Sequence, residues 1–486
     1  MSRTATDFGD NETFWATKVL GIDLHHDPVR ELGSDRLRTA RLPITALVQP
    51  GVRHNNRRRA HLLVSTVLGK HLPTDPRVVL GAGDQLGDLV RAVLGERDAV
   101  VLGFAETATG LGHCVAARIG ASCYLHSTRR AVPHASTLAG FEEGHSHATS
   151  HLLQPAPADI FVNDLPLVLV DDEISTGATA IDAVRALHAF APRAHYVLAS
   201  LVDLRTEADR AQFDAAAAEL GARIDTVCLA IGRASLPEGL VDAVGALPEP
   251  RLNPTAAHLG SFGRVELPWP TAVPEGGRHG VLASDIGAFE AALLEAGQAL
   301  TARLDADFAG RPVIVLGHEE LMYLPLRLAA LLAESGTPTR FQTTTRSPAY
   351  VLDEPGYPLR RGFRFTAPEP GDAAPRYLYN AQWPATSLDL FEADLAGLVA
   401  ARSDRDAAVT ITDDGVDSGA EGDGPAADPV LVVVVDSPAD TAELTAEHGL
   451  IDVLTASGAD VLLAVLPEAD PRRLYAERVE SNGSRR

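Results

Sequence analysis

Two carboxylates directly follow an apolar run in the first half of the chain. Residues 165–187 read LPLVLVDDEISTGATAIDAVRAL, and Asp171 and Asp172 stand where the run ends. A turn with hydroxyls and a glycine follows at 173–179, and the spacing after it predicts a helix. A helix N-terminus offers unpaired backbone N–H groups and a positive dipole end, which together bind phosphate. The acid pair would repel that phosphate unless it faces sugar hydroxyls or a metal ion. The segment therefore predicts a site for a phosphorylated sugar.

A second strand–loop–helix pattern lies upstream. The apolar run AVVLGF is followed by the small, threonine-rich loop AETATG and by the helical pattern LGHCVAARIG. A strand that ends in such a loop before a helix is again an anion-binding geometry, although a plain βα turn would show the same sequence pattern. The first pattern likewise could be an ordinary strand-to-helix turn with a chance acid pair. If this loop binds an anion, Glu106 needs a metal ion beside it or must point away.

A long segment without periodicity, 131–151, reads AVPHASTLAGFEEGHSHATSH. A loop of this length inside a compact domain is usually a lid or a binding loop. The HxHxxxH spacing of His145, His147 and His151 also permits a zinc site, or a purely structural cluster. The arginines at 129–130, just before the segment, could hold anionic oxygens through their forked donors.

Around these loops, apolar runs alternate with helical patterns, which predicts an α/β fold with a parallel sheet flanked by helices. Residues 61–71 read as a helix preceded by the arginine-rich stretch 53–59, which is either a solvated helix start or a phosphate or substrate contact. The run VVLGAG at 78–83 reads as a strand and the next twelve residues as a helix. Further strands are expected at 195–203 and 223–233.

Composition limits the possible functions. A chain of 486 residues predicts two or three domains. Its 65 acidic and 42 basic residues give a net charge of −23, which argues against a nucleic-acid-binding surface. The 3 cysteines show no metal or disulfide spacing, which suits a reducing compartment. With no signal-peptide pattern and no apolar run long enough for a bilayer, we expect a cytoplasmic protein with no membrane partner.

The second half of the chain repeats the layout of the first. The stretch from PVIVLGHEEL to TTTRSP follows the order of VVLGFAETATG to STRR, and DPVLVVVVDSP echoes LPLVLVDDE, with Asp436 aligned to Asp171. The repeat lacks the glycine- and hydroxyl-bearing loop, so we expect a degenerate copy of the same α/β unit. An acidic, glycine-rich stretch at 402–429 predicts a disordered insertion within it.

The run VLVDDEISTGATA resembles the ribose-phosphate-binding motif of type I phosphoribosyltransferases. The string Thr345-Arg346-Ser347-Pro348, with GHEELMYLP, YLYN, RHNNRRRAHLLVSTVLGKH, GFAETATGLG and EEGHSHATSH, resembles a two-domain family that carries a C-terminal TRSP domain. That family is associated with tellurium-resistance and stress gene clusters and is thought to help make a nucleoside-like compound. The resemblance covers residues from about 40 to 400.

The resemblance implies a type I phosphoribosyltransferase-like sheet flanked by helices, with a second α/β domain. The expected divisions are an N-terminal extension at 1–40, the phosphoribosyltransferase-like domain at 41–232, a proline-rich connector at 233–271, the TRSP-type domain at 272–475 and a tail at 476–486.

It also implies transfer of a phosphoribosyl group from 5-phosphoribosyl 1-pyrophosphate, with Mg²⁺, to a base or base-like acceptor, or the reverse. The magnesium ion would be held near Asp171 and Asp172, mainly through the ligand. The expected sites are catalytic Asp171, Asp172, Glu143, His145 and His147; ribose-phosphate-binding Ser175, Thr176, Gly177, Ala178 and Thr179; pyrophosphate-binding Ala105, Thr107, Thr109, Gly110, Arg129 and Arg130; and Arg346 as a second-domain candidate.

Three other possibilities stay open at this point. The chain could be a non-catalytic protein that senses a ribose phosphate, although the lid and the first loop favour an enzyme. Arg346 could simply cap a strand or pair with an acid at a domain interface. A homodimer is possible.

Overall fold

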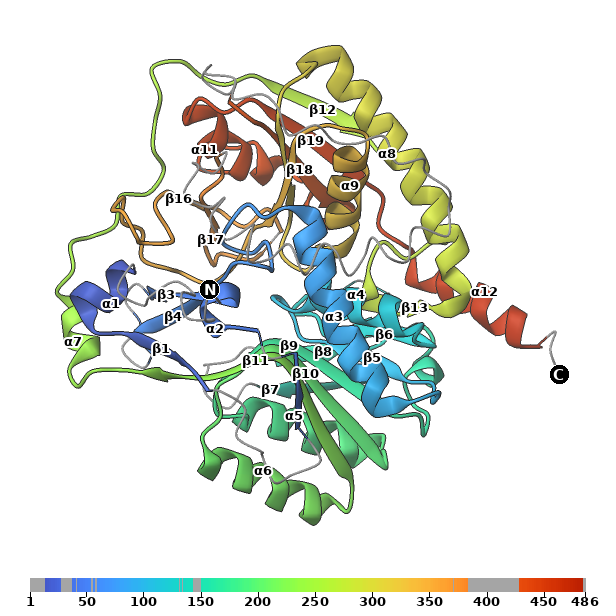
Figure 1. Ribbon diagram of the computed structural model, residues 1–486. Coiled ribbons are helices and arrows are strands. Elements are labelled where there is room, and N and C mark those ends of the chain that lie inside the picture. Colours follow the sequence, from blue (N-terminus) through green and yellow to red (C-terminus); the bar gives the residue numbers. More distant parts are fainter. Residues whose placement is uncertain are drawn as a thin grey trace, which may run out of the picture.

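The computed structural model describes residues 14–27, 37–40, 42–53, 56, 59–130, 132, 134–142, 150–369, 371–382 and 428–483. Two parallel-dominated sheets, each flanked by helices, form its framework (Figure 1). Nearly all of the expected acidic insertion lies at 402–427, outside the described residues. Among the described helices, none is both long and apolar enough to cross a bilayer.

The first sheet carries the motifs of the first half. Across the sheet its strands run β1 (Asp23–His26), β11 (Arg223–Ser235), β10 (His195–Asp203), β9 (Leu167–Ile174), β5 (Val100–Gly103), β6 (Cys123–His126) and β13 (Val281–Leu282), with β2 (Leu37–Thr39) also paired to β11. The edge strands β1 and β13 are antiparallel to their neighbours, and the other pairs are parallel. Because β5, β6 and β9 are parallel, the loops that follow them meet at one edge of the sheet.

The second sheet repeats this arrangement. Its order is β12 (Phe262–Glu266), β19 (Val461–Leu466), β18 (Val430–Asp436), β14 (Val313–Gly317) and β15 (Thr339–Thr343), all parallel. The order β19-β18-β14-β15 matches β10-β9-β5-β6 of the first sheet strand for strand. The expected copy is therefore present in the fold, in a sheet of 5 strands against 8.

Register refines the alignment of the two copies. Val170 pairs with Gly103, which ends β5, and Val434 pairs with Gly317, which ends β14. Counted from these glycines, Asp436 occupies the position of Asp172. The alignment of Asp436 with Asp171 is therefore wrong by one residue, because a run of similar apolar residues fixes no register by itself.

Helices pack between and around the sheets. The principal ones are α3 (Pro76–Leu94), α4 (Thr109–Ile119), α5 (Ala178–Phe190), α6 (Glu207–Leu220), α8 (Ile286–Phe308), α9 (Tyr323–Glu334), α11 (Leu450–Ala456) and α12 (Pro471–Gly483), and shorter ones are α1 (Trp15–Leu20), α2 (Ile44–Leu47) and α7 (Leu240–Gly245). One apolar cluster runs from the first sheet through α3, α4, α8 and α9 to the second sheet. The two units therefore share a core, and α8 runs along one side of the molecule (Figure 1).

Within the part of the chain that the structure describes, three hairpins lie outside the two main sheets. They are β3 (Val48–Val52) with β4 (His61–Ser65), β7 (Ala139–Glu142) with β8 (Ser150–Leu153), and β16 (Gly362–Phe365) with β17 (Arg376–Tyr379). The β3–β4 hairpin contradicts the predicted helix at 61–71. Its apolar residues pair with β3 and are buried there, and this tertiary pairing outweighs the helical spacing.

The expected strand at 78–83 is also wrong, since VVLGAG lies inside helix α3. Asp75 caps that helix, its side chain accepting from the Arg77 amide, and Pro76 takes the first helical position. The glycines of this helix permit close packing on α4, because a Cβ at Gly83 would stand 2.3 Å from the Cβ of Cys114. A short apolar run cannot separate a buried helix from a strand.

Candidate functional site

A cavity of about 870 Å³ opens where the loops after β5, β6 and β9 meet beneath the β3–β4 hairpin. Its lining combines three parts of the predicted site with residues that were not assigned to it, some of them in the 53–59 stretch that the sequence left as either a solvated helix start or a substrate contact. From the predicted site come Ala105, Thr107, Arg129, Asp171, Asp172, Ser175, Thr176, Gly177, Ala178 and Thr179. The others include Arg53, Asn56, Arg59, His61, Lys70, His71, His151 and Glu173.

The acid pair lies at the end of β9, which extends to Ile174. Burial and the neighbouring carboxylate of Asp172 raise the pKa of Asp171 well above its usual value. Burial likewise raises the pKa of Asp172, with Lys70 acting in the opposite direction. The ionised form of the acid pair is therefore destabilised, and a polyol or a cation bound against the two carboxylates would stabilise it.

The phosphate-type loop has the geometry that its sequence predicts. Gly177 adopts the left-handed conformation with φ 81° and is the N-cap of α5, whose first turn contains no acidic residue. A Cβ at Gly177 would stand 3.0 Å from the side chains of Arg205 and Phe213, which pack beneath the loop. The Arg205 guanidinium is fixed by Asp203 at 2.8 Å. A rigid base therefore presents the N-terminus of α5 to the cavity.

The loop after β5 is anchored from two sides. The amide of Ala105 donates to Oγ of Ser127 at 2.9 Å, and Nζ of Lys70 donates to Oγ1 of Thr107 at 2.7 Å. Thr109 faces the second unit instead, where its hydroxyl donates to the carbonyl of Glu320 at 2.9 Å. A Cβ on Gly110 would meet Met322 at 2.9 Å, so this glycine also serves the contact between the units.

The two neighbouring arginines separate. Arg129 lines the cavity. Arg130 is directed into the second unit, where its guanidinium lies 2.5 Å from Glu369, 3.3 Å from Glu319 and 3.7 Å from Asp436. Arg130 is absent from the cavity lining formed by the described residues, as are Thr109 and Gly110, so these three are not brought into the cavity with Ala105, Thr107 and Arg129.

Arg53 and Arg59, between β3 and β4, line the cavity, and we call them its cationic wall. Arg59 donates to Glu173 beside the acid pair. Burial lowers the pKa of Arg59, but Glu173, Asp172 and Asp171 together raise it above its usual value. Burial and the charge of Arg59 lower the pKa of His61 to about 4, so this imidazole is neutral. Burial, with Lys70 and Arg53, lowers the pKa of His71 as well. The arginine-rich stretch 53–59 was the sequence signal for this wall.

The lid candidates are only partly within reach. Glu143, His145 and His147 lie outside the described residues. His151, the last histidine of the same HxHxxxH string, is 2% exposed and lines the cavity. Its Nδ1 lies 2.7 Å from Oγ of Ser127, the hydroxyl that accepts from Ala105. Its role was missed because the pattern gave no reason to prefer it over the other histidines.

Arg346 lies at the contact between the two units. Its guanidinium lies 2.9 Å from Glu319 and 3.3 Å from Asp372, and its backbone amide donates to Oε1 of Glu106 at 3.0 Å. Glu106 is 7% exposed and is absent from the cavity lining among the described residues. Of the two options for Glu106, the structure therefore has the one in which the carboxylate points away.

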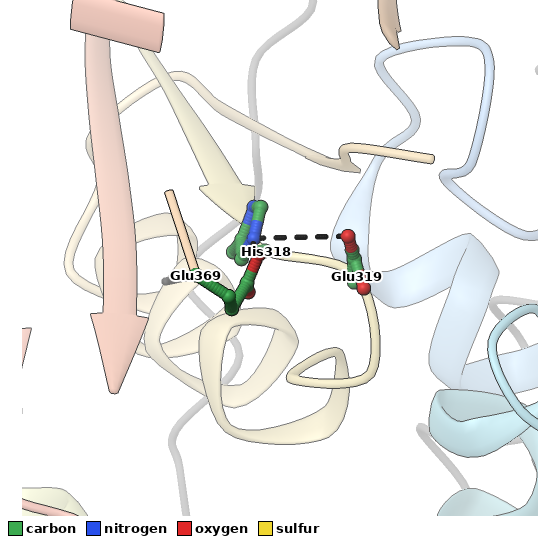
Figure 2. A group of neighbouring side chains, drawn as sticks. All are labelled: His318, Glu319 and Glu369. Atoms are coloured by element: carbon green, nitrogen blue, oxygen red, sulfur yellow. Dashed lines mark hydrogen bonds and ion pairs between the residues drawn. The ribbon is translucent and has the colours of Figure 1, made fainter. Parts of the chain in front are cut away.

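The matching place in the second unit holds buried ion pairs. His318 and Glu319 follow β14 and face Glu369 (Figure 2), with Nε2 of His318 3.0 Å from Oε1 of Glu369. This trio has the donor types of a metal site, but Arg130, Arg346 and Arg376 all bind Glu319. Three guanidinium groups oppose a cation there, so the trio serves the contact between the units.

The equivalent of the acid pair is also occupied. Asp436 is 2% exposed and lies 3.2 Å from Arg278. After β18 the chain forms the short turn Ser437–Ala439, and the next α-helix begins only at Leu450. In the first unit the helix begins four residues after β9 ends, at Ala178. The expected loss of the phosphate-type loop from the second copy is confirmed.

Comparisons with known proteins agree with the two-unit layout. Residues 47–233 match the family model described as phosphoribosyl transferase, and residues 275–454 match that of the TRSP domain C-terminal to it. No curated protein gave a significant match.

Among solved structures, the chain is similar to adenine phosphoribosyltransferases from several organisms. For the Trypanosoma brucei enzyme the identity is 16%, covering 38% of this chain and 76% of that one, with a TM-score of 0.30. The Leishmania donovani enzyme has 16% identity, with 42% of this chain and 86% of that one covered and a TM-score of 0.31. The Rhodothermus marinus enzyme has 16% identity, with 38% of this chain and 100% of that one covered and a TM-score of 0.27. The two family matches, in this order along one chain, make this protein a member of the two-domain phosphoribosyltransferase family with a C-terminal TRSP domain.

Proposed function

We propose that the protein transfers the phosphoribosyl group of 5-phosphoribosyl 1-pyrophosphate to a base or base-like acceptor, or runs the reverse reaction. The observation that carries this proposal is the cavity itself. It brings a helix N-terminus, a half-buried acid pair and the 105–107 loop with Lys70 and Arg129 into one space of about 870 Å³. These three parts suit a phosphate, a ribose diol and a pyrophosphate, in that order.

Each part has a role in the reaction. The backbone of Ser175–Thr179 would hold the 5-phosphate at the start of α5. Asp171 and Asp172 would accept hydrogen bonds from the ribose hydroxyls and stabilise the positive charge that develops as the C1–O bond breaks. The bond electrons leave with pyrophosphate, whose oxygens Lys70, Arg129 and the 105–107 loop would hold. The acceptor nitrogen then bonds to C1 and releases its N–H proton to solvent.

The acid pair also fits a magnesium ion. Mg²⁺ prefers hard oxygen donors and usually takes only one or two protein carboxylates together with substrate oxygens. The raised pKa values of Asp171 and Asp172 mark negative charge that a cation would neutralise. When bound, the ion would neutralise charge on the leaving pyrophosphate. The two aspartates would hold it mainly through the ligand.

Four finer expectations remain proposals. They are the cytoplasmic location, a possible homodimer, a role in making a nucleoside-like compound and the tie to tellurium-resistance gene clusters. A non-catalytic sensor of a ribose phosphate is the competing function, since it would need the same cradle. His151 and the Lys70–Thr107 contact favour the enzyme, because a sensor that reads only the ribose phosphate needs neither.

The test replaces both acids. Asp171→Asn combined with Asp172→Asn should abolish release of pyrophosphate from 5-phosphoribosyl 1-pyrophosphate in the presence of Mg²⁺ and candidate bases, with the circular-dichroism spectrum unchanged. Asp182→Asn combined with Asp214→Asn, two exposed acids, makes the same change in net charge and should leave turnover intact. Undiminished activity in the first variant would refute the site. A wild-type protein that is stabilised by the substrate but never turns it over would favour the sensor.

A further inference from the structure

The two units exchange the same contact in both directions. Oε1 of Glu106 accepts from Oγ1 of Thr345 at 2.5 Å and from the amide of Arg346 at 3.0 Å. In the reverse direction, Glu320 accepts from Oγ1 of Thr128 at 2.7 Å and from the amide of Arg129 at 2.8 Å. Each glutamate is thus held by a Thr-Arg pair of the other unit.

These residues occupy matching places in the two copies. Glu106 follows β5 and Glu320 follows β14, three residues after the glycine that ends each strand. The Thr-Arg pairs follow β6 and β15, and each threonine also bridges to a hairpin, Thr128 to Leu152 and Thr345 to Tyr377. Contacts repeated with the partners exchanged are the pattern of an isologous interface between two copies.

Only the first copy lies beside the cavity, so the exchange has unequal consequences. The loop that carries Glu106 also carries Ala105 and Thr107, which line the cavity. If the Glu106 carboxylate turned toward the cavity, it would repel a pyrophosphate bound to that loop. The direction of the Glu106 side chain therefore bears on how strongly the loop binds an anion.

The second unit holds other walls of the same cavity. Oγ of Ser347 accepts from Nη1 of Arg53 at 3.2 Å, and the amide of Tyr350 donates to the carbonyl of Val52 at 2.9 Å. The amide of Thr343 donates to the carbonyl of Gly69 at 2.9 Å, next to Lys70. Residues 343–350, which contain the TRSP string, thus fasten the cationic wall, the lysine and the first loop.

We propose that Thr345, together with the Arg346 amide, is a positioning device that keeps the Glu106 carboxylate turned away from the side of its loop that lines the cavity. The TRSP string thereby sets the affinity of the first unit for the pyrophosphate end of its substrate. This inference rests on the proposed function. It assigns the second unit a part in substrate binding without a ligand of its own.

The experiment removes one hydroxyl. Thr345→Val keeps the shape of the buried side chain and removes the hydroxyl donor to Oε1 of Glu106, which leaves the Arg346 amide as the remaining donor of the pair. KM for 5-phosphoribosyl 1-pyrophosphate should rise about tenfold, equivalent to about 1.4 kcal/mol, while kcat changes by less than about twofold. Thr345→Ser keeps the hydroxyl and should retain the wild-type KM. Thr339→Val, the same substitution on β15 with its hydroxyl bonded to Thr337, is the matched control. If Thr345→Val does not fold, Thr345→Ala carries the same test.

A second substitution distinguishes an effect of the Glu106 charge on KM from an effect of altered packing. Adding Glu106→Gln to Thr345→Val removes the charge and should return KM to within about twofold of the wild type. An unchanged KM in Thr345→Val, or a raised KM that Glu106→Gln does not restore, overturns the inference alone. A wild-type protein whose melting temperature does not respond to 5-phosphoribosyl 1-pyrophosphate with Mg²⁺ overturns the proposed function, and the inference with it.

Discussion

Nζ of Lys70 donates a hydrogen bond to Oγ1 of Thr107 at 2.7 Å, across the gap between the β3–β4 region and the loop after β5. Lys70 is one of only two lysines in the chain. It also lines the cavity and opposes the rise in the pKa of Asp172, which burial causes. One ammonium group therefore faces both the expected pyrophosphate loop and the acid pair.

Lys70→Gln should weaken substrate binding. We expect KM for 5-phosphoribosyl 1-pyrophosphate to rise roughly 10- to 100-fold, the range for a lost hydrogen bond to a charged group. Steady-state kinetics measures the change. The other lysine, Lys18, is exposed on α1 and provides the control, since Lys18→Gln should change neither KM nor kcat. Equal effects of the two substitutions would remove Lys70 from the site.

The raised pKa of Asp171 predicts that folding stability depends on pH and that the ionised acid lowers stability while it supports turnover. Because burial and the charge of Asp172 raise the pKa of Asp171, the folded state binds more protons than the unfolded chain between the ordinary aspartate pKa and the raised one. Stability therefore falls as the pH rises through that window. Asp171→Asn removes the unfavourable charge and should raise the melting temperature while it abolishes turnover.

Calorimetry at two pH values checks this. The advantage of Asp171→Asn over the wild type should be small near pH 4, close to the ordinary aspartate pKa, because the raised pKa keeps Asp171 largely protonated in the folded state there. It should be larger at pH 7.5. Mg²⁺ with substrate should narrow the difference by stabilising the wild type. A melting temperature that drops in the variant at pH 7.5 would contradict the unfavourable charge at Asp171.

Gly177 gives a third prediction, about the phosphate-type loop. Gly177→Ala puts a side chain at φ 81° and 3.0 Å from Arg205 and Phe213. The left-handed conformation costs roughly 1–2 kcal/mol for a residue with a Cβ. Gly221, with φ 63°, ends α6 in open space, so Gly221→Ala bears the conformational cost without the contact.

Denaturant unfolding and substrate kinetics together distinguish the two glycines. Both variants should lose stability, Gly177→Ala more than Gly221→Ala, and only Gly177→Ala should raise KM for 5-phosphoribosyl 1-pyrophosphate. Equal KM values in both variants would mean that the loop does not hold the 5-phosphate.

The elements of the candidate site whose local structure could be read from the sequence are those that follow one another along the chain. Strand, acid pair, turn and helix follow one another within 165–187, so hydrophobic spacing and turn chemistry place them without knowledge of the rest of the chain. The repeat was likewise readable, because two apolar strands with similar loops recur in the same sequence order.

The parts that were missed depend on contacts between residues far apart in the chain. His61–Ser65 becomes a strand because β3 pairs with it, and 78–83 is helical because its glycines pack against α4. Lys70, His151 and the hold of Thr345 on Glu106 join residues from 24 to 239 positions apart. No local pattern marks such partners, so the walls of the cavity could not be assigned from periodicity.

The reciprocal hold between Glu106 and Glu320 has one more consequence. Two separate subunits related in this way would come apart on dilution, and a site built with residues of both would fail with them. Here a covalent chain keeps the halves at a fixed, high local concentration. Specific activity should therefore stay constant down to nanomolar protein, and one half has been free to lose its own loop while continuing to support the other.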